Sequence, residues 1–177
     1  MKTKTILLLS LLMINLAFLI GCNQLKYKPL NTVPNVDLNK YMGKWYEIST
    51  IPQRFQKGCH CTTANYSLTQ KEYVQVVNSC RKDSTNGANS GIEGKAFVVK
   101  NSNNSKLKVQ FFWPIKAKYW IIDLAEDYSY AVVGHPNRKY LWVLSRTPQM
   151  DDNTYQQIIK RLKEQDFNTD LLVKTIH

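Results

Sequence analysis

The sequence predicts an all-β fold in which eight short strands follow one another along the chain and one α-helix comes after them. Eight segments rich in β-branched and aromatic residues recur at regular spacing, separated by short turn signals. Within these segments apolar and polar residues alternate, as Leu107, Val109 and Phe111 do with the lysines and the glutamine between them. A period of two with one polar face is typical of half-buried antiparallel strands. Such strands form either an open sandwich or a closed barrel.

Short links between the segments favour a meander in which each strand pairs with the next. The expected strands span residues 44–50, 61–69, 73–81, 92–100, 106–113, 119–124, 128–134 and 140–146. After them, Asp151 or Asp152 can cap a helix whose apolar stripe consists of Tyr155, Ile158, Ile159 and Leu162. This stripe predicts a helix packed on the outside of the sheet, followed by a last short strand over 171–176.

The start of the chain is typical of an export signal. Lys2 and Lys4 precede an apolar run over 6–20, which is short for a bilayer span of about 20 residues. The run ends in the stretch LIGC, closed by Cys22, which resembles the lipobox of bacterial lipoproteins. This resemblance implies cleavage before Cys22, a diacylglycerol on its sulfur and a third acyl chain, such as palmitate, on its new amine. An ordinary cleaved signal and a membrane-bound signal anchor are the alternatives.

Acyl chains on Cys22 would hold the protein stably, because lasting membrane attachment takes two or more chains. Asn23 stands where an aspartate would follow, which resembles the outer-membrane sorting signal of Gram-negative bacteria. We therefore expect a signal peptide over 1–21, a tether over 22–36 and one domain over 37–177. The expected location is the outer membrane, lipid-anchored and facing the periplasm.

The chain is strongly basic, with 24 Lys and Arg against 13 Asp and Glu and a formal net charge of +11. Such an excess favours anionic lipid headgroups, although a basic soluble surface accounts for it equally well. Nucleic acid is not an expected partner, because the chain is predicted to be exported and carries no basic–aromatic motif of a known reader.

Four segments occur in the order in which lipocalins have them. Residues 43–47 (GKWYE) resemble the G-x-W signature of that family, and residues 64–68 (ANYSL) resemble the second strand of apolipoprotein D and its bacterial relatives. Residues 127–131 (DYSYA) and 141–148 (LWVLSRTP) resemble the second and third conserved blocks. With the lipobox, the pattern resembles the bacterial outer-membrane lipoprotein lipocalins of the apolipoprotein D-like group, from residue 37 to about 175.

The resemblance implies a lipocalin calyx, an eight-stranded antiparallel up-and-down barrel with the C-terminal helix outside. Such a barrel has no free sheet edges and can hold one small ligand. In this architecture Gly43 opens the signature, Trp45 plugs the closed end and Arg146 lies across the indole. A guanidinium over an indole face is a cation–π contact of roughly 0.5–2 kcal/mol. We therefore expect this group to be structural and not to contact the ligand.

Alternation predicts an apolar and aromatic interior, which suits an acyl chain with a few polar anchors. The expected lining residues, which plain core packing would place inside equally well, are Tyr66, Val74, Val76, Val109, Phe111, Tyr119, Ile121, Val133, Tyr140 and Trp142. The resemblance points to fatty acids or lysophospholipids as ligands, held for storage or transport at the outer membrane, with no cofactor. A haem or other tetrapyrrole is the alternative ligand, and a homodimer stays open.

Two loops are expected near the open end of the barrel, one with Phe55 and one with residues 112–115. Lys116 and Lys118 flank the second loop. They would either meet the carboxylate or phosphate of a ligand or remain solvated charges.

Three cysteines remain after Cys22, so at least one of them is free or pairs elsewhere. An exported protein can form a disulfide. A hairpin brings Cys61 near Cys80, and we favour this bridge, with Cys59 as the rival partner of Cys80. Alternation places Cys61 and Cys80 on opposite faces unless a β-bulge intervenes. A zinc site built from Cys59, His60, Cys61 and Cys80 is not expected, because neighbouring strand residues point to opposite faces.

We expect no enzymatic activity. His60, His135 and His177 lie in no known nucleophile motif, and neither G-x-S-x-G nor G-x-G-x-x-G occurs. The acidic cluster around residues 123–127 is expected to form a turn. A thiol-dependent enzyme, with Cys59 or Cys61 as the nucleophile, is the remaining alternative.

Overall fold

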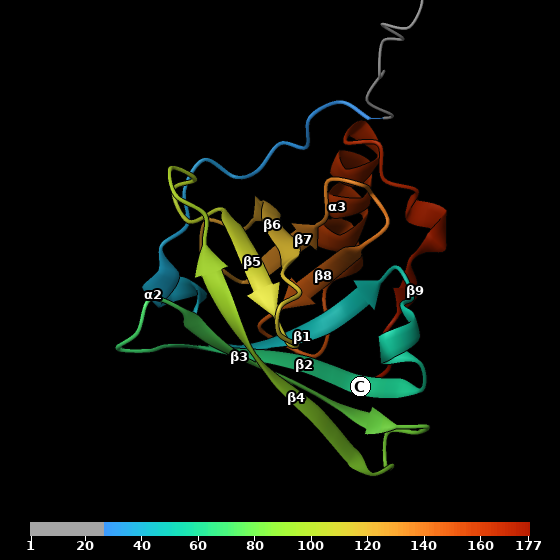
Figure 1. Ribbon diagram of the computed structural model, residues 1–177. Coiled ribbons are helices and arrows are strands. Elements are labelled where there is room, and N and C mark those ends of the chain that lie inside the picture. Colours follow the sequence, from blue (N-terminus) through green and yellow to red (C-terminus); the bar gives the residue numbers. More distant parts are fainter. Residues whose placement is uncertain (1–26) are drawn as a thin grey trace, which may run out of the picture.

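The structure, a computed structural model, describes residues 27–177 and shows a β-barrel with one long helix beside it (Figure 1). Its elements are α2 (Leu38–Tyr41), β1 (Gly43–Thr50), a 3-10 turn η1 (Arg54–Gln56), β2 (Cys59–Leu68), β3 (Val74–Lys82), β4 (Asn89–Val98), β5 (Lys106–Gln110), β6 (Ala117–Leu124), β7 (Tyr130–Gly134), β8 (Leu141–Ser145), α3 (Asp152–Glu164), η2 (Thr169–Leu171) and β9 (Val173–Lys174). The predicted eight-stranded antiparallel barrel with an outer C-terminal helix is confirmed.

β1 closes the barrel because it pairs with strands from both ends of the sheet. Residues 43–46 pair with β2, and residues 46–50 pair with β8. A β-bulge between Glu47 and Ser49 lies within the second half. From β2 to β8 every strand pairs antiparallel with the next one in the chain, and β9 adds two pairs to β1.

Alternate residues of the strands build two apolar clusters, one on each face of the sheet. The inner cluster contains Trp45, Tyr66 and Val76, all buried. The outer cluster joins Val132 and Val143 to the stripe of α3, in which Ile158 and Leu162 are buried. The apolar stripe therefore packs against the barrel wall, as the sequence predicts.

Polar contacts fix α3 on this wall. The carboxylate of Asp151 caps the helix by accepting a hydrogen bond of 2.9 Å from the backbone N–H of Thr154. The hydroxyl of Tyr155 donates to Ser49 Oγ at 3.0 Å, and Arg161 Nε lies 2.7 Å from Asp123 Oδ2. The helix therefore covers β1 and β6 to β8 in one orientation.

The segment that leads into α2 lies along the outside of the barrel (Figure 1, blue). Lys28 O accepts a hydrogen bond from Arg138, Val33 N–H donates to Ile121 O, and Val36 is fully buried. The described part of the expected tether, residues 27–36, thus packs on the domain. The expected signal peptide and Cys22 lie outside the described residues. Within residues 27–177 no helix has the length and hydrophobicity to cross a bilayer.

The observed strands differ from the expected ones mainly around β5, which ends at Gln110 rather than at Trp113. Phe111 turns inward over Gly94, where an added Cβ would lie 2.7 Å from the ring. Only glycine permits this close approach. β4 begins at Asn89, three residues earlier than expected, β9 is shorter than the predicted last strand, and α2 is too short for a periodic signal.

Candidate functional site

The two ends of the barrel are built from different loops. In this up-and-down topology the loops that follow β1, β3, β5 and β7 lie at one end, here called the mouth. The loops that follow β2, β4 and β6 lie at the other end, called the floor, together with α2. The interior between the mouth and the floor is the candidate site.

Arg146 and Trp45 meet at the floor. The guanidinium carbon of Arg146 lies 3.7 Å from the centre of the Trp45 ring, which is fully buried. The guanidinium also donates to three backbone carbonyls, those of Lys40 at 2.6 Å, Lys44 at 2.9 Å and Tyr128 at 3.3 Å. One side chain thus ties α2, β1 and the loop after β6 together beneath the barrel.

Three tyrosine hydroxyls from different elements meet just above this floor. The hydroxyl of Tyr119 lies 2.8 Å from that of Tyr41 and 2.9 Å from that of Tyr66. Burial raises the pKa of all three phenols, that of Tyr66 to about 12, so they stay neutral. Three hydroxyl protons serve two hydrogen bonds, so one O–H donor remains for a ligand. Trp45 Nε1 fixes Tyr41 by donating to its carbonyl at 2.9 Å.

Nine of the ten expected lining residues lie in the inner cluster or pack against it. Those in the inner cluster or packed against it are Tyr66, Val76, Val109, Phe111, Tyr119, Ile121, Val133 and Trp142, with Val74 beside them. Tyr140 lies outside the cluster, in the loop after β7, and its ring stacks on Trp142 with 6.3 Å between centroids. Phe111, Tyr119 and Trp142 remain partly exposed although they face inward.

Asn78 is an inward-facing polar residue that the sequence reasoning missed. It lies on the face of β3 that carries Val74 and Val76, and it pairs with Ala64 and Ile92. Its Oδ1 is buried without a hydrogen-bond partner in the described structure. Ile92, on the same face, is 37 % exposed. The alternation that identified Val76 was sufficient to place Asn78 inside, but it gave no sign that the amide oxygen would be left unpaired.

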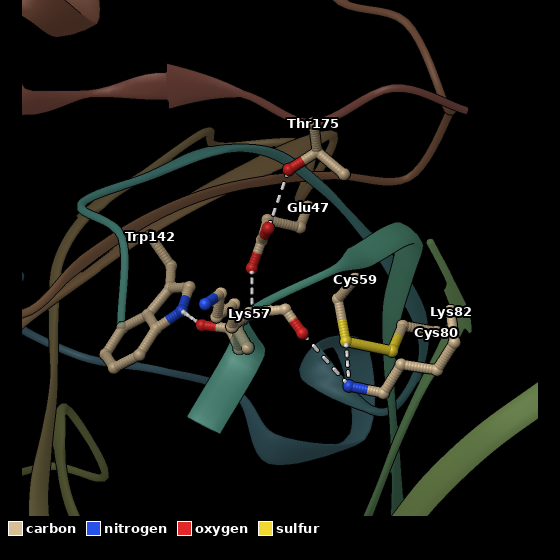
Figure 2. Close-up of a disulfide and its surroundings, with 8 residues drawn as sticks. Glu47, Lys57, Cys59, Cys80, Lys82, Trp142 and Thr175 are labelled. Carbon is tan, nitrogen blue, oxygen red and sulfur yellow. Dashed lines mark hydrogen bonds between the residues drawn. A yellow bond between two sulfur atoms is a disulfide. The ribbon is translucent and has the colours of Figure 1, made fainter. Parts of the chain in front are cut away.

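A buried acid organises the mouth (Figure 2). Glu47 accepts hydrogen bonds from Thr175 Oγ1 at 2.6 Å and Gln56 Nε2 at 2.8 Å, and Gln56 Oε1 in turn accepts from Trp142 Nε1 at 3.1 Å. Burial raises the pKa of Glu47, and the hydrogen bonds from Thr175 and Gln56 oppose that shift. This chain connects the C-terminal segment to the loop after β1 and to the interior.

The disulfide lies beside this chain and joins Cys59 to Cys80, with a Cα–Cα distance of 5.4 Å (Figure 2). The favoured bridge from Cys61 is therefore wrong, and the rival pairing is present; among the described cysteines Cys61 is free. The ladder between β2 and β3 shifts between His60 and Thr63, and Cys61 has a positive φ of 49°. This irregularity resets the direction of the side chains, so that Cys59 reaches Cys80.

The acidic residues around 123–127 lie outside the interior of the barrel. Asp123 is paired with Arg161 on the outer wall, and Asp127 caps the turn before β7 by accepting from Ser129 N–H at 3.0 Å. In the part of the chain that the structure describes, no three His, Cys, Asp or Glu side chains gather closely enough to hold a metal ion. A groove of about 390 Å³ opens where β5 leaves β4, and Phe111 lines both this groove and the inner cluster.

Known proteins resemble this chain in both sequence and fold. A family model described as a lipocalin-like domain matches residues 36–177. The chain is 36% identical over 157 residues to temperature-induced lipocalin-1 of Arabidopsis thaliana, covering 84% of this chain and 83% of the relative. It is 37% identical over 142 residues to outer membrane lipoprotein Blc of Vibrio cholerae, covering 80% and 82%. Insecticyanin from the tobacco hornworm Manduca sexta has a similar fold, with a TM-score of 0.66 at 22% identity over 86% and 85% of the two chains.

Proposed function

The chain belongs to the lipocalin family, and we propose on this basis that its barrel binds a fatty acid or a lysophospholipid for storage or transport at the outer membrane. Members of the family bind small hydrophobic ligands. The observation that carries the proposal is the inner face of the barrel, where apolar walls lie above a floor with three tyrosine hydroxyls. An amphiphile likewise joins an apolar chain to polar groups.

The walls supply the apolar contact. Val76, Val109 and Val133 are buried around the inner face, whereas Phe111 and Trp142 stay partly exposed there. Inward aromatic side chains that remain accessible offer a surface that an acyl chain can cover, since covering apolar surface stabilises the complex.

Polar groups at two levels favour an amphiphile over a plain hydrocarbon. The tyrosine cluster offers one O–H donor at the floor, and the orphaned Oδ1 of Asn78 is an acceptor higher on the wall. A buried acceptor without a partner is costly, and a ligand hydroxyl would satisfy it. A lysophospholipid carries a free hydroxyl on its glycerol, whereas an ionised fatty acid has no donor. Asn78 therefore favours the lysophospholipid.

Ligand titration tests the proposal. The delipidated protein is expected to bind one lysophospholipid or fatty acid per barrel, followed by quenching of its tryptophans. Val76→Phe fills the interior and is expected to weaken binding at least tenfold, whereas Val77→Phe, one residue along on the outer face, leaves affinity unchanged. Circular dichroism checks that both variants fold. Failure to bind either amphiphile, or equal binding by both variants, would refute the proposal; a visible absorbance band in the purified protein would favour the tetrapyrrole.

The membrane attachment belongs to the same proposal. The stretch that ends at Cys22 supports a lipid anchor at the outer membrane, and the similarity to outer membrane lipoprotein Blc agrees with that location. Cell fractionation after labelling with a palmitate analogue checks this. We expect the label and the protein in the outer-membrane fraction, and we expect Cys22→Ser to lose the label. An unlabelled wild-type protein would exclude the anchor while leaving the ligand titration intact.

A further inference from the structure

We propose that the mouth of the barrel docks on an anionic bilayer, so that the open end faces the lipid. This inference rests on the proposed carriage of amphiphiles, because docking would bring the interior to the surface from which they come. Three independent features of the mouth support it: its exposed apolar side chains, its charge, and the point at which the chain enters the domain.

Two loops of the mouth expose large apolar side chains. In the loop after β1, Phe55 is 68 % exposed, and in the loop after β5, Phe112, Trp113 and Ile115 are 68 %, 88 % and 70 % exposed. The two loops are separate, and Trp113 also lines the groove that contains Tyr73 and Gln75. Large exposed apolar groups mark an interaction surface. Tryptophan is particularly suited to the membrane interface, where its ring lies among the headgroups.

The charge of the barrel is divided between its ends. Eight basic residues and one acidic residue lie in the four mouth segments, which are 51–58, 81–90, 111–118 and 135–140. Three basic and four acidic residues lie in the floor segments, which are 37–43, 69–73, 99–105 and 125–129. Basic residues near a surface of anionic lipids are attracted to it. Arg138 is buried, and the other basic residues of the mouth segments are accessible, so the mouth complements an anionic bilayer better than the floor does.

The N-terminal segment enters the domain at the mouth. Arg138, in the loop after β7, donates from Nη2 to Lys28 O at 2.8 Å, and its guanidinium lies 5.3 Å from the ring centre of Tyr27. Cys22 is six residues before Lys28, and six residues reach at most about 20 Å. A lipid on Cys22 would therefore keep the mouth within that distance of the bilayer.

The loop that carries Phe55 is held in position from inside. Gln56 donates to the buried Glu47 and accepts from Trp142, so the residue after Phe55 is fixed toward the interior. Phe55 itself points to solvent, with Arg54 beside it. The loop thus presents its apolar residue outward without unfolding, which lowers the ordering that docking requires.

Brominated lipids test the docking on the full chain reconstituted into vesicles of phosphatidylcholine and phosphatidylglycerol, with bromine on the acyl chains. Bromine quenches a tryptophan that it can touch. We expect quenching of the wild type that Trp113→Phe largely removes. Trp120→Phe is the matched control and should keep it, because Trp120 lies on the outer wall with Lys106 Nζ 4.5 Å from its ring centre. Leaving out phosphatidylglycerol, or raising the salt, should weaken the Trp113 signal.

Equal quenching in the wild type and in Trp113→Phe would overturn the docking. This outcome does not depend on whether a lipid on Cys22 attaches the chain to the vesicle. The substitution affects a side chain that is 88 % exposed, so loss of the fold is not expected and circular dichroism verifies it. The amphiphile titration is run separately in the absence of vesicles. Binding without Trp113 quenching would reject the docking alone, and quenching without binding would reject the proposed ligand alone.

Discussion

Removing the contact between Trp45 and Arg146 at the floor of the barrel should destabilise the fold without changing the affinity for the ligand. The two perturbations are Trp45→Ala and Arg146→Ala, which remove the two halves of the contact whose centres lie 3.7 Å apart. Arg146 lies outside the inner cluster, and Trp45 lies at its lower end, where its ring is 5.1 Å from that of Tyr41. Their loss should therefore lower the free energy of unfolding while the affinity of the folded fraction stays the same.

The magnitudes follow from burial and hydrogen bonding. Trp45 is completely buried, and truncating a buried tryptophan to alanine costs about 3–5 kcal/mol. Arg146 contributes a cation–π contact of roughly 0.5–2 kcal/mol. Its hydrogen bonds to Lys40 O and Lys44 O add about 1 kcal/mol each, since both are partly solvated. Arg146→Ala should thus cost about 2–4 kcal/mol, which for a domain of this size lowers Tm by roughly 5–15 °C.

Urea unfolding followed by circular dichroism measures these losses, and a ligand titration below the transition measures affinity. Arg146→Lys is the matched control, because it keeps the positive charge but loses the planar fork that reaches several carbonyls at once. It should fall between the wild type and Arg146→Ala. Unchanged unfolding midpoints in Trp45→Ala and Arg146→Ala, or a tenfold loss of affinity in folded protein, would contradict the structural role.

Three further outcomes are expected. Cys80→Ser should lower the free energy of unfolding by about 3 kcal/mol, because the bridged cysteines are 21 positions apart, whereas Cys61→Ser should change little. Peptide mapping should show Cys61 alkylated and Cys59 linked to Cys80. Burial raises the pKa of Glu47, so the folded chain keeps a proton that the unfolded chain releases. The free energy of unfolding should therefore fall as the pH rises from about 4.5 through the raised pKa. Unfolding curves of Glu47→Gln measured over this pH range should show a weaker dependence of stability on pH. Asn78→Leu should weaken lysophospholipid binding roughly three- to tenfold and leave fatty-acid binding unchanged, which titrations of both ligands would reveal.

The strands and the outer helix were accessible from the sequence because their signals are local. Alternation in the stretch from Lys106 to Phe111 gave the strand and its inward face, and the spacing of Ile158 and Leu162 gave the stripe of α3. Closure of the barrel was not accessible in this way, since an open sandwich has the same alternation. The family resemblance resolved it, and it also named Trp45 and Arg146, which the structure places in contact.

The parts that sequence reasoning missed depend on residues that are distant along the chain. Glu47 follows the signature tryptophan by two residues, but the hydroxyl that binds it comes from Thr175, 128 positions away. The disulfide was assigned to the wrong cysteine because strict alternation cannot locate a bulge, and one irregularity after His60 reverses the face of every earlier residue in the strand. The expected strand continued through Phe111, but β5 ends at Gln110. The ring of Phe111 lies over Gly94, a residue of another strand.

β1 shows how one strand serves three separate tasks. Trp45 faces the floor, Glu47 accepts the hydrogen bonds that position the mouth loop, and Ser49 accepts a hydrogen bond from Tyr155 on the outer helix. In a regular strand Glu47 and Ser49 would point to the same face of the sheet. The bulge between them lets Glu47 point toward the inside of the barrel and Ser49 toward the outer helix. The floor, the mouth loop and the outer helix therefore depend on different side chains of the same strand. Substitutions at these positions should alter one property at a time, and a change at Trp45 that altered membrane contact would show that the floor and the mouth are coupled.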